Sequence, residues 1–543
     1  MSYFKSTRPA WIYYAAALAG LVLAAGAVKI IEYDVWWHLT TGWVIANLHI
    51  IPRYDIFSYT AFGHPWMNHE WLFQLIQWLI YDNGGPIALT IMKLMIVAAT
   101  TCLLFVTVAR LAVTRNAALW ASILFLWQAA YRVMDRPFLV GMLLLAIYGL
   151  ILHTYVRRKT RAVWALPLLQ IFWINTHGGG LLGLEVVLAF AAGESLQAFA
   201  EKRLGGPAAI DSMRRERLWV VGALCALSCI INPWGFDAFV FPFQHMQMHE
   251  ILSHTREWLP VLHPALDGLI PPIIVLAVFG ATVISFILNT KKASVSHLLL
   301  FAMTAMLLPK GHRFGAEFLI VNLPIMFSNF ASFAKERGLS YPGYAYSWIQ
   351  LAAAFAISSL ALSFGIPISL NGEMLNYVGI GATTISAPAR MVDFLEYHKI
   401  RGRVFNHMGT GAYLIFRRWP GELVFIDGRT PVYGDEFYGR FIDALRYYRN
   451  FEQLDSSYKF DYLVFAADNA AREENLQRGI WQNPQWKLVY AGSDGLVYLR
   501  NEPKFAELIK RLELKKNPLI EFFDSKDKPP AKRETQATPV TKG

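Results

Sequence analysis

Two carboxylates stand directly after the first long apolar segment of the chain. Glu32 and Asp34 follow that segment, and Trp36, Trp37 and His38 come next. Partial burial would raise the pKa of such a carboxyl group and make it a base that works near neutral pH. Two carboxylates one residue apart can also hold a divalent cation, Mg²⁺ or Mn²⁺, on a phosphate. Either chemistry suits transfer of a group from a phosphate to a hydroxyl; the alternative is a solvated cap at a membrane boundary.

A second set of candidate residues is cationic. The loops "YRVMDRP" and "LPKGHRFG" carry Arg132, Arg136, Lys310, His312 and Arg313. Short loops outside the membrane are normally poor in Lys and Arg, so these groups run against the trend. Because guanidinium groups bind phosphate well, we interpret these residues as contacts to a lipid phosphate. Alternatively, these residues anchor the protein in the membrane, with their charged ends extended to the lipid headgroups.

Histidines form a third set. The motif "NTHGGG" ends a predicted span, and its glycines could allow close approach of the backbone to a substrate or simply break the helix. His245 and His249 have the spacing of a metal-ligand pair, but the sequence has no HExxH motif and we interpret them as interfacial polar residues. The further candidate substrate-binding residues are His38, His69, Glu70 and His177.

Apolar segments must position these residues. The chain of 543 residues is 55% hydrophobic and only 16% charged, whereas soluble proteins have roughly 25% charged residues. A helix needs about 20 apolar residues to cross a bilayer. The sequence therefore predicts a mainly α, polytopic membrane protein with about eleven spans. We place them at 11–31, 87–112, 116–134, 138–156, 162–177, 181–200, 218–236, 269–289, 295–309, 314–334 and 346–366.

The net charge of +11 reflects orientation rather than nucleic-acid binding. Lys and Arg gather in every second loop, for example at 157–161 and 202–217. This pattern marks the cytoplasmic side of a membrane. It predicts a protein of the bacterial plasma membrane with a cytoplasmic N-terminus and, since the number of spans is odd, an extracytoplasmic C-terminal region.

The chain divides into three parts. A transmembrane domain covers 1–366 and includes a large first outer loop at 32–86. Within that loop we expect a helix at 34–49, a short hairpin in "FSYTAFGHPWM", and a second helix at 69–82 that ends at "NGGP" and is too short to cross the membrane. The tryptophans of the loop suit the depth of the lipid headgroups.

The second and third parts follow the last predicted span. A small extracytoplasmic α/β domain at 385–503 alternates helical runs with the strand-like runs "GRVFNH", "AYLIFRR", "ELVFIDGR" and "DYLVFAAD". It finishes in "WKLVYAGSDGLVYLR", where Asp-Gly predicts a hairpin. The polar tail at 524–543 is expected to be disordered.

The pattern resembles the GT-C glycosyltransferases, integral membrane enzymes that take sugars from polyprenyl-phosphate carriers. The likeness lies in the acidic pair Glu32 and Asp34 just after the first span, the interfacial-helix loop behind it, and a multi-span body that leads to an α/β domain. Within that class, "DVWWHLTTGWVI", "PRYDIFSYT", "GHPWMNHEWL", "NTHGGG", "NPWG" and "VFIDGR" are similar to a bacterial glycosyltransferase-like group. The chain lacks the "WWDYG" type of acceptor motif found in oligosaccharyltransferases.

The resemblance implies roles for the acids. Asp34 would be the general base or would orient the acceptor, and Glu32 would be its neighbour or a metal ligand. The implied partners are membrane lipids and a polyprenyl-phosphate sugar donor, and the acceptor is a lipid, a glycan or a protein. Two alternatives remain: a transporter or flippase of a lipid-linked intermediate, and a non-catalytic assembly protein. Ionisable groups of a transporter belong near mid-span, whereas here they gather at one face, which favours an enzyme.

Overall fold

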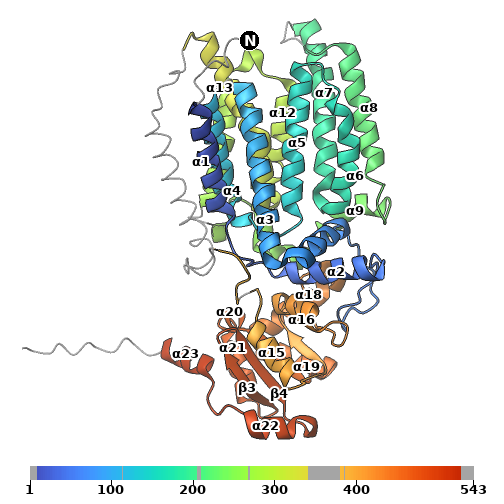
Figure 1. Cartoon of the computed structure of the whole chain (residues 1–543), viewed down its shortest axis with the longest axis vertical. Helices are drawn as coiled ribbons and strands as arrows, with labels where there is room; N and C mark the ends of the chain where they lie inside the picture. The colour runs from blue at the N-terminus through green and yellow to red at the C-terminus, as the bar shows by residue number, and fades with distance from the viewer. Residues whose placement is uncertain are drawn as a thin grey trace, which may run out of the picture. The chain divides into compact units, whose positions relative to one another are not determined.

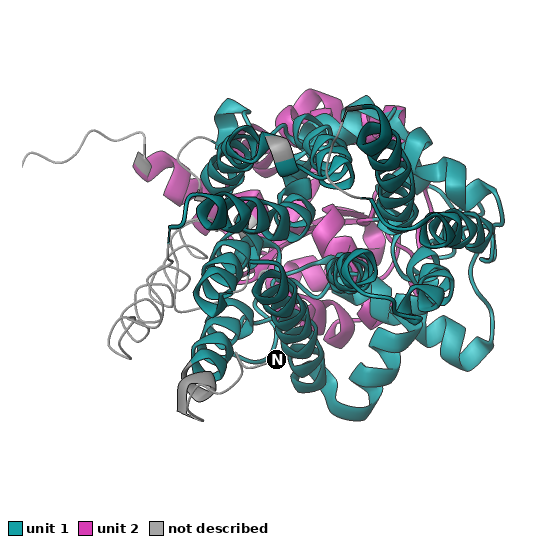
Figure 2. Cartoon of the chain, turned by 90° about the horizontal axis from the view of Figure 1, so that it is seen from above, with its two compact units in different colours: residues 1–56, 61–386, 429–435 teal, residues 57–60, 387–428, 436–543 magenta. Residues whose placement is uncertain are grey.

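The structure is a computed structural model that describes residues 9–112, 114–204, 209–266, 270–339, 379–384 and 386–526. It divides into two compact units, coloured teal and magenta in Figure 2. Unit 1 comprises residues 1–56, 61–386 and 429–435, and unit 2 comprises 57–60, 387–428 and 436–543. Each unit therefore contains a short segment taken from the sequence of the other.

Unit 1 is a bundle of apolar helices that run side by side (Figure 1). Each predicted span overlaps one of these helices except 346–366, which lies outside the described residues. The helices are α1 (Pro9–Gly26), α3 (Trp71–Ala112), α4 (Arg115–Ala129), α5 (Phe138–Arg157), α6 (Leu166–Thr176), α7 (Leu181–Leu204), α8 (Ser212–Ser228), α11 (Ile270–Leu288), α12 (Val295–Ala305) and α13 (Gly315–Glu336).

The bundle identifies a multi-pass membrane protein. Within the described part of the chain, 5 helical segments are long and apolar enough to cross a bilayer. Three shorter apolar segments accompany them, Tyr14–Gly26, Ala162–Thr176 and Val295–Lys310. The mainly α fold class is confirmed, while the total of about eleven crossings stays a prediction.

The first outer loop holds the helix expected at its start. Helix α2 (Asp34–Leu48) ends where His49 adopts a left-handed conformation, and most of its side chains are buried. The second expected helix is the first part of α3, which breaks at Gly85 with φ of 59° and ψ of −154° just before Pro86. Only glycine adopts that conformation without strain. The helix end predicted from "NGGP" is therefore confirmed. The expected hairpin pairs further toward the N-terminus, through a single antiparallel bridge between Tyr54 and Pro65.

Gly42 sets how closely α2 can pack on the first part of α3. A Cβ atom at Gly42 would lie 2.1 Å from the Gln74 carbonyl oxygen and 2.6 Å from the Trp78 Cβ. We expect Gly42→Ala to force these helices apart and to lower the free energy of unfolding by about 1–3 kcal/mol. Thermal unfolding in detergent measures this. Gly149→Ala on α5 is the matched control, because nothing lies within 4 Å of its added Cβ and alanine has a higher helix propensity than glycine. An equal loss of stability in both variants would contradict the packing argument.

Unit 2 is built on a four-stranded sheet of order β1-β2-β4-β3. Strand β1 (Val404–Asn406) pairs in parallel with β2 (Tyr462–Ala466). Strand β4 (Gly495–Arg500) lies antiparallel to β2 and to β3 (Trp486–Gly492). Gly492 pairs with Gly495 across the turn, so the hairpin predicted from Asp-Gly is confirmed.

Helices surround this sheet where some strands were expected. The run "AYLIFRR" lies in α16 (Met408–Arg418), so its prediction as a strand is wrong. A parallel β1–β2 pair needs a long crossover between its strands, and α16 supplies part of it. The run "ELVFIDGR" forms only one isolated bridge, from Val424 to Ser58. Unit 2 also contains α15 (Ala389–Tyr397), α18 (Asp435–Arg446, whose first residue belongs to unit 1), α19 (Tyr448–Tyr458), α20 (Ala467–Ala470), α21 (Glu474–Gln482), α22 (Ala506–Leu512) and α23 (Pro518–Lys526). The short helix α17 (Thr430–Tyr433) lies in the segment 429–435 of unit 1.

Helix α23 corrects part of the expected tail. It extends to Lys526, so residues 524–526 are helical rather than disordered. Residues 527–543 lie outside the described part of the chain.

The segment 429–435 is tied into unit 1 by a buried ion pair. Arg429 Nη2 lies 2.6 Å from Asp55 Oδ1, and the two side chains are 1% and 0% exposed. The Arg429 guanidinium also stacks over the ring of Trp66 at 4.6 Å. Breaking a buried charge pair by removal of one partner is costly, so this segment is an integral part of the unit in which it packs.

Candidate functional site

The two acids that follow α1 share one guanidinium group. Arg136 Nη2 lies 2.6 Å from Glu32 Oε1 and 2.9 Å from Asp34 Oδ2. Its other nitrogen, Nη1, lies 3.3 Å from Glu257 Oε1. The sequence singles out these acids and Arg136 as separate candidates, and the structure brings them into direct contact. Glu257, in the segment between α10 (His249–His254) and α11, joins them although the sequence did not single it out.

The neighbouring tryptophans are buried, and one of them, Trp37, donates to an acid. Trp37 donates from Nε1 to Asp34 Oδ1 at 3.1 Å, and Trp36 donates to the Ser386 carbonyl oxygen at 2.6 Å. Trp36, Trp37 and Trp66 are 4%, 5% and 6% exposed. Their interpretation as headgroup-facing residues is therefore wrong: the rings are inside the protein. Asp34 also lies in the first turn of α2, where the helix dipole favours a negative charge.

A buried ion pair fixes the loop that carries Arg136. Lys93, in the second part of α3, donates to Asp135 Oδ2 at 2.9 Å, and both side chains are 1% exposed. Lys93 also donates to the Val28 carbonyl oxygen at 2.8 Å, and Gln77 donates to the Asp135 carbonyl oxygen at 3.0 Å. The backbone immediately before Arg136 is therefore attached to the end of α1 and to both parts of α3.

The other predicted cations divide between buried and exposed. Arg132 is buried, donates to the Arg313 carbonyl oxygen and stacks on Phe138 at 4.0 Å. Arg313 lies 3.4 Å from Glu257 and over the ring of Trp258 at 4.3 Å. These positions make Arg132 and Arg313 part of the scaffold around the acids.

His312 and Lys310 occupy the same loop. His312 is buried and lies 2.9 Å from the Tyr131 hydroxyl through Nδ1. Lys310 is exposed. A phosphate-binding role for this set of residues stays a prediction, and Lys310 is the member of the set that is open to solvent.

The predicted histidines converge on Glu70. His38 Nε2 and His69 Nε2 lie 3.8 and 3.6 Å from the Glu70 carboxylate. Gln74 Nε2 contacts His38 Nδ1 at 3.3 Å. A Cβ at Gly178 would lie 2.9 Å from the His69 ring, so the first glycine of "NTHGGG" permits close approach of the backbone to a histidine. The ring of His38 contacts that of Trp37, with 3.8 Å between the ring centroids, and so joins this cluster to the acids.

Burial and neighbouring charges shift several pKa values at the site. Burial raises the pKa of the Glu32 carboxyl, which outweighs the opposing charge of Arg136. Burial alone would also raise the pKa of Glu257, but Arg313 and Arg136 bring it down to about 2. Burial lowers the pKa of His38, and it lowers the pKa of His177 to about 3. At neutral pH the site therefore holds a charged Glu257 and neutral His38 and His177.

The His69–Glu70 contact predicts a pH dependence of stability. Burial by itself would lower the pKa of His69, but contact with Glu70 outweighs it and the pKa is raised. The contribution of this contact to the free energy of unfolding is thus fully present below the pKa of histidine in the unfolded chain, about 6.5. It is lost as the pH rises through the higher pKa of His69 in the folded protein. We expect Glu70→Gln to lower the free energy of unfolding by about 1 kcal/mol at pH 6 and by clearly less at pH 9.

Thermal unfolding of both proteins across this pH range tests the expectation. The titration of Glu70 itself does not interfere, because its pKa is lowered to about 2 despite its burial. Glu216→Gln, at an exposed position of α8, is the matched control. A difference between wild type and Glu70→Gln that stays constant from pH 6 to pH 9 would contradict the assignment.

Glu32 and Asp34 do not fit a divalent cation as they are arranged. The Arg136 guanidinium lies between them, and it contacts the oxygens that would coordinate the ion. Among the described residues, no group of three or more His, Cys, Asp and Glu side chains is placed to hold a metal. Glu32 Oε1 and Asp34 Oδ2, the oxygens that a divalent ion would need, are both engaged by Arg136.

Sequence reasoning missed Glu257, Lys93 and Asp135. Lys93 had a usable signal, because it lies deep inside the apolar run 87–112, whose other cation, Arg110, is near the end, and a charge at that depth must be paired. Asp135 lies between Arg132 and Arg136, and its acidic side chain was overlooked beside those cations. Glu257 had no local signal beyond its position between Arg256 and Trp258.

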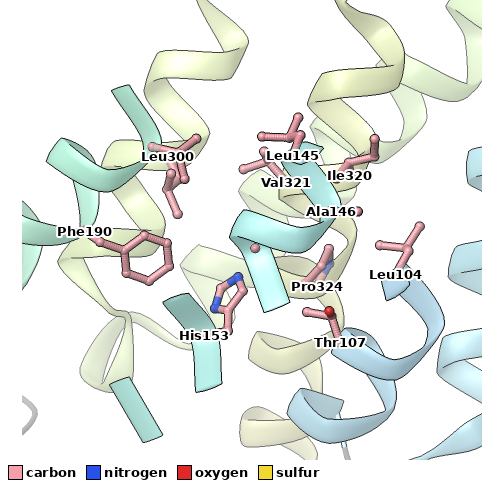
Figure 3. Close-up of a pocket in the computed structure, with 12 residues that line it drawn as sticks. Leu104, Thr107, Leu145, Ala146, His153, Phe190, Leu300, Ile320, Val321 and Pro324 are labelled. Carbon is pink, nitrogen blue, oxygen red and sulfur yellow. The ribbon is translucent and has the colours of Figure 1, made fainter. Parts of the chain in front are cut away.

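A cavity elsewhere in the bundle is too small to be a substrate site. Figure 3 shows His153, Thr107 and apolar side chains around it, and its volume is about 20 Å³. This is about the space that one water molecule needs. The candidate site residues around Arg136 and Glu70 do not line this cavity.

The fold is similar to those of an oligosaccharyltransferase and of ArnT, both known from solved structures. The Archaeoglobus fulgidus oligosaccharyltransferase in the apo form is 12% identical with a TM-score of 0.50, and the match covers 93% of this chain and 76% of that protein. ArnT from Cupriavidus metallidurans bound to undecaprenyl phosphate is 11% identical with a TM-score of 0.49, over 91% of this chain and 98% of ArnT. Apo ArnT gives 11% identity and a TM-score of 0.48, over 90% and 97%. No family model matches the sequence, and no curated protein matches it.

The match to the oligosaccharyltransferase concerns the fold. This chain shares the fold of that protein, which agrees with the polytopic architecture that the resemblance in its sequence implied. Its acidic pair lies where the first apolar helix leads into α2.

Proposed function

We propose that this protein is a membrane glycosyltransferase that moves a sugar from a polyprenyl-phosphate-linked donor to a lipid, glycan or protein acceptor. The observation that carries the proposal is the contact of Asp34 with Arg136 at 2.9 Å, inside a fold of the GT-C class. Asp34 acts as the base or acceptor-orienting carboxylate. Arg136 and Trp37 fix the direction of its two oxygens, and such pre-organisation lowers the barrier to group transfer.

A groove beside the site suits a lipid-linked donor. It has a volume of about 640 Å³ and is lined by Trp71, Leu72, Leu168, Ile171, Phe172, Asn175, Ile230, Ile231, Asn232 and Pro233. Trp71 adjoins Glu70 in sequence and donates to Asn175 at 2.8 Å. Apolar walls that lead to a polar end fit an isoprenoid chain with a phosphate head.

The charge pattern of the loops supports an orientation. We place the N-terminus in the cytoplasm and the acidic site at the outer face of a bacterial plasma membrane, with the α/β unit outside. The donor phosphate would then approach from the bilayer toward the exposed Lys310 and the partly exposed Arg313.

Comparison of cells with and without the gene tests the function directly. Mass spectrometry of lipid-linked sugars and surface glycans should show a donor that accumulates and a glycan that loses one sugar when the gene is absent. The purified protein in vesicles should then transfer that sugar from its polyprenyl phosphate to the acceptor. Movement of a labelled polyprenyl lipid across vesicles without any covalent product would instead indicate a flippase, and the proposal would fall.

A further inference from the structure

The cluster of three acids at the site surrounds a cation that belongs to the protein. Arg136 contacts Glu32, Asp34 and Glu257 at 2.6, 2.9 and 3.3 Å. Glu32 lies between α1 and α2, Asp34 lies in the first turn of α2, and Glu257 lies between α10 and α11, so two parts of the chain that are distant in sequence converge on one guanidinium. Carboxylates that converge in this way commonly hold a divalent cation. In this chain the central position is filled by a side chain.

We propose that Arg136 takes the place of a divalent metal ion: its fixed guanidinium neutralises and orients the acids, so Asp34 works without a metal cofactor. This inference rests on the proposed function of the site. An arginine keeps its charge at every relevant pH, and its planar fork binds two carboxylates with defined geometry. Arg136 is thus a positioning residue that acts through Asp34.

The surroundings of Arg136 oppose its replacement by an ion. Asp135, its neighbour in the chain, is held by Lys93 at 2.9 Å, and Gln77 holds the Asp135 carbonyl oxygen. The guanidinium therefore projects from an anchored backbone. A metal would have to displace it from Glu32 and Asp34 together, and would leave a positive group beside the bound ion.

The positive charges around the acids also favour Arg136 over a metal ion at this position. Arg313 supplies a second positive group 3.4 Å from Glu257. Wild-type protein therefore presents three acids that already contact two guanidinium groups. Removal of Arg136 should convert the cluster into a site that attracts a divalent ion, because three carboxylates would then face a space without their central charge.

Manganese binding tests the proposal without any transfer assay. Mn²⁺ is titrated by calorimetry into wild type and Arg136→Ala, both purified in detergent and stripped with EDTA. We expect Arg136→Ala to bind one Mn²⁺ about tenfold or more tightly than wild type. Arg136→Ala combined with Glu32→Gln should lose this gain, and Arg136→Lys, which keeps a positive charge, should not show it. Arg53→Ala is the matched control, since its exposed guanidinium donates to the Pro233 carbonyl oxygen.

Several outcomes would overturn the proposal. One Mn²⁺ bound tightly by wild type, and lost in Glu32→Gln, would mean that a metal and not Arg136 is the resident cation. A folded Arg136→Ala that gains no affinity for Mn²⁺ would mean that the acids do not form a cation position. If Arg136→Ala does not fold, the wild-type titration and the Arg136→Lys titration still decide. A failure of the proposed function appears separately, as absence of transfer with the Mn²⁺ results unchanged.

Discussion

Asp34→Asn is expected to abolish sugar transfer while the protein remains folded and inserted. Asparagine keeps the shape of the side chain and an oxygen that can accept from Trp37 Nε1, 3.1 Å from Asp34 Oδ1 in the wild type. It removes the negative charge that pairs with Arg136 and the ability to accept a proton. Loss of a general base typically costs about 10²–10⁴-fold in rate, so kcat should fall by that factor with a small change in KM.

The measurement is transfer by reconstituted vesicles, with thermal unfolding as the test of folding. Asp82→Asn is the matched control, because Asp82 is an exposed acid in the same outer loop and its replacement should leave the rate unchanged. An Asp34→Asn variant that transfers at the wild-type rate would show that Asp34 is not the base. A variant that loses activity together with its unfolding transition would reveal a structural role instead.

The second large effect concerns stability. Lys93→Met leaves the Asp135 carboxylate buried without its cation and the Val28 carbonyl oxygen without its donor. Removal of one partner of a buried ion pair costs about 3–5 kcal/mol. We therefore expect a loss of that size in the free energy of unfolding, together with reduced transfer, since Arg136 follows Asp135 in the chain.

Removal of both charges should recover most of this loss. The double variant Lys93→Met with Asp135→Leu has no buried charge, and replacement of both members of a buried pair by apolar residues is often neutral. Lys202→Met, at an exposed position near the end of α7, is the control. If the single variant unfolds at the wild-type temperature, or the double variant is no better than the single one, the pair does not have the role assigned to it.

Local signals predicted what depends on short segments of sequence. Apolar length placed the spans, and "NGGP" placed the break in α3, because both properties belong to consecutive residues. The position of the acids relative to α2 followed from the same local reasoning. The partner of the acids was only partly predictable: Arg136 is 104 residues from Glu32, and Glu257 is 121 residues from Arg136. The distribution of Lys and Arg among the loops indicated that Arg136 is unusual, but it contained no information about which carboxylates Arg136 contacts.

Short apolar runs account for the errors in unit 2. Periodicity alone cannot separate a short buried strand from a buried helix, and "AYLIFRR" is of that kind. The chain enters α16 directly from β1 through His407, so tertiary connectivity decided the outcome. The tryptophans were misjudged for a related reason. A tryptophan side chain suits both a headgroup layer and a protein interior. Here Trp36 and Trp37 are inside the protein, where their ring N–H groups donate to Ser386 and Asp34.

The exchange of residues 57–60 and 429–435 between the units constrains genetic dissection of this protein. A stop codon after residue 386 would delete Arg429 along with the α/β unit, and the Asp55 carboxylate would lose the guanidinium 2.6 Å from it. Inactivity of such a deletion would say nothing about what the α/β unit does, because the remaining bundle would be damaged as well. A deletion that restores 429–435 through a short linker would separate the two causes.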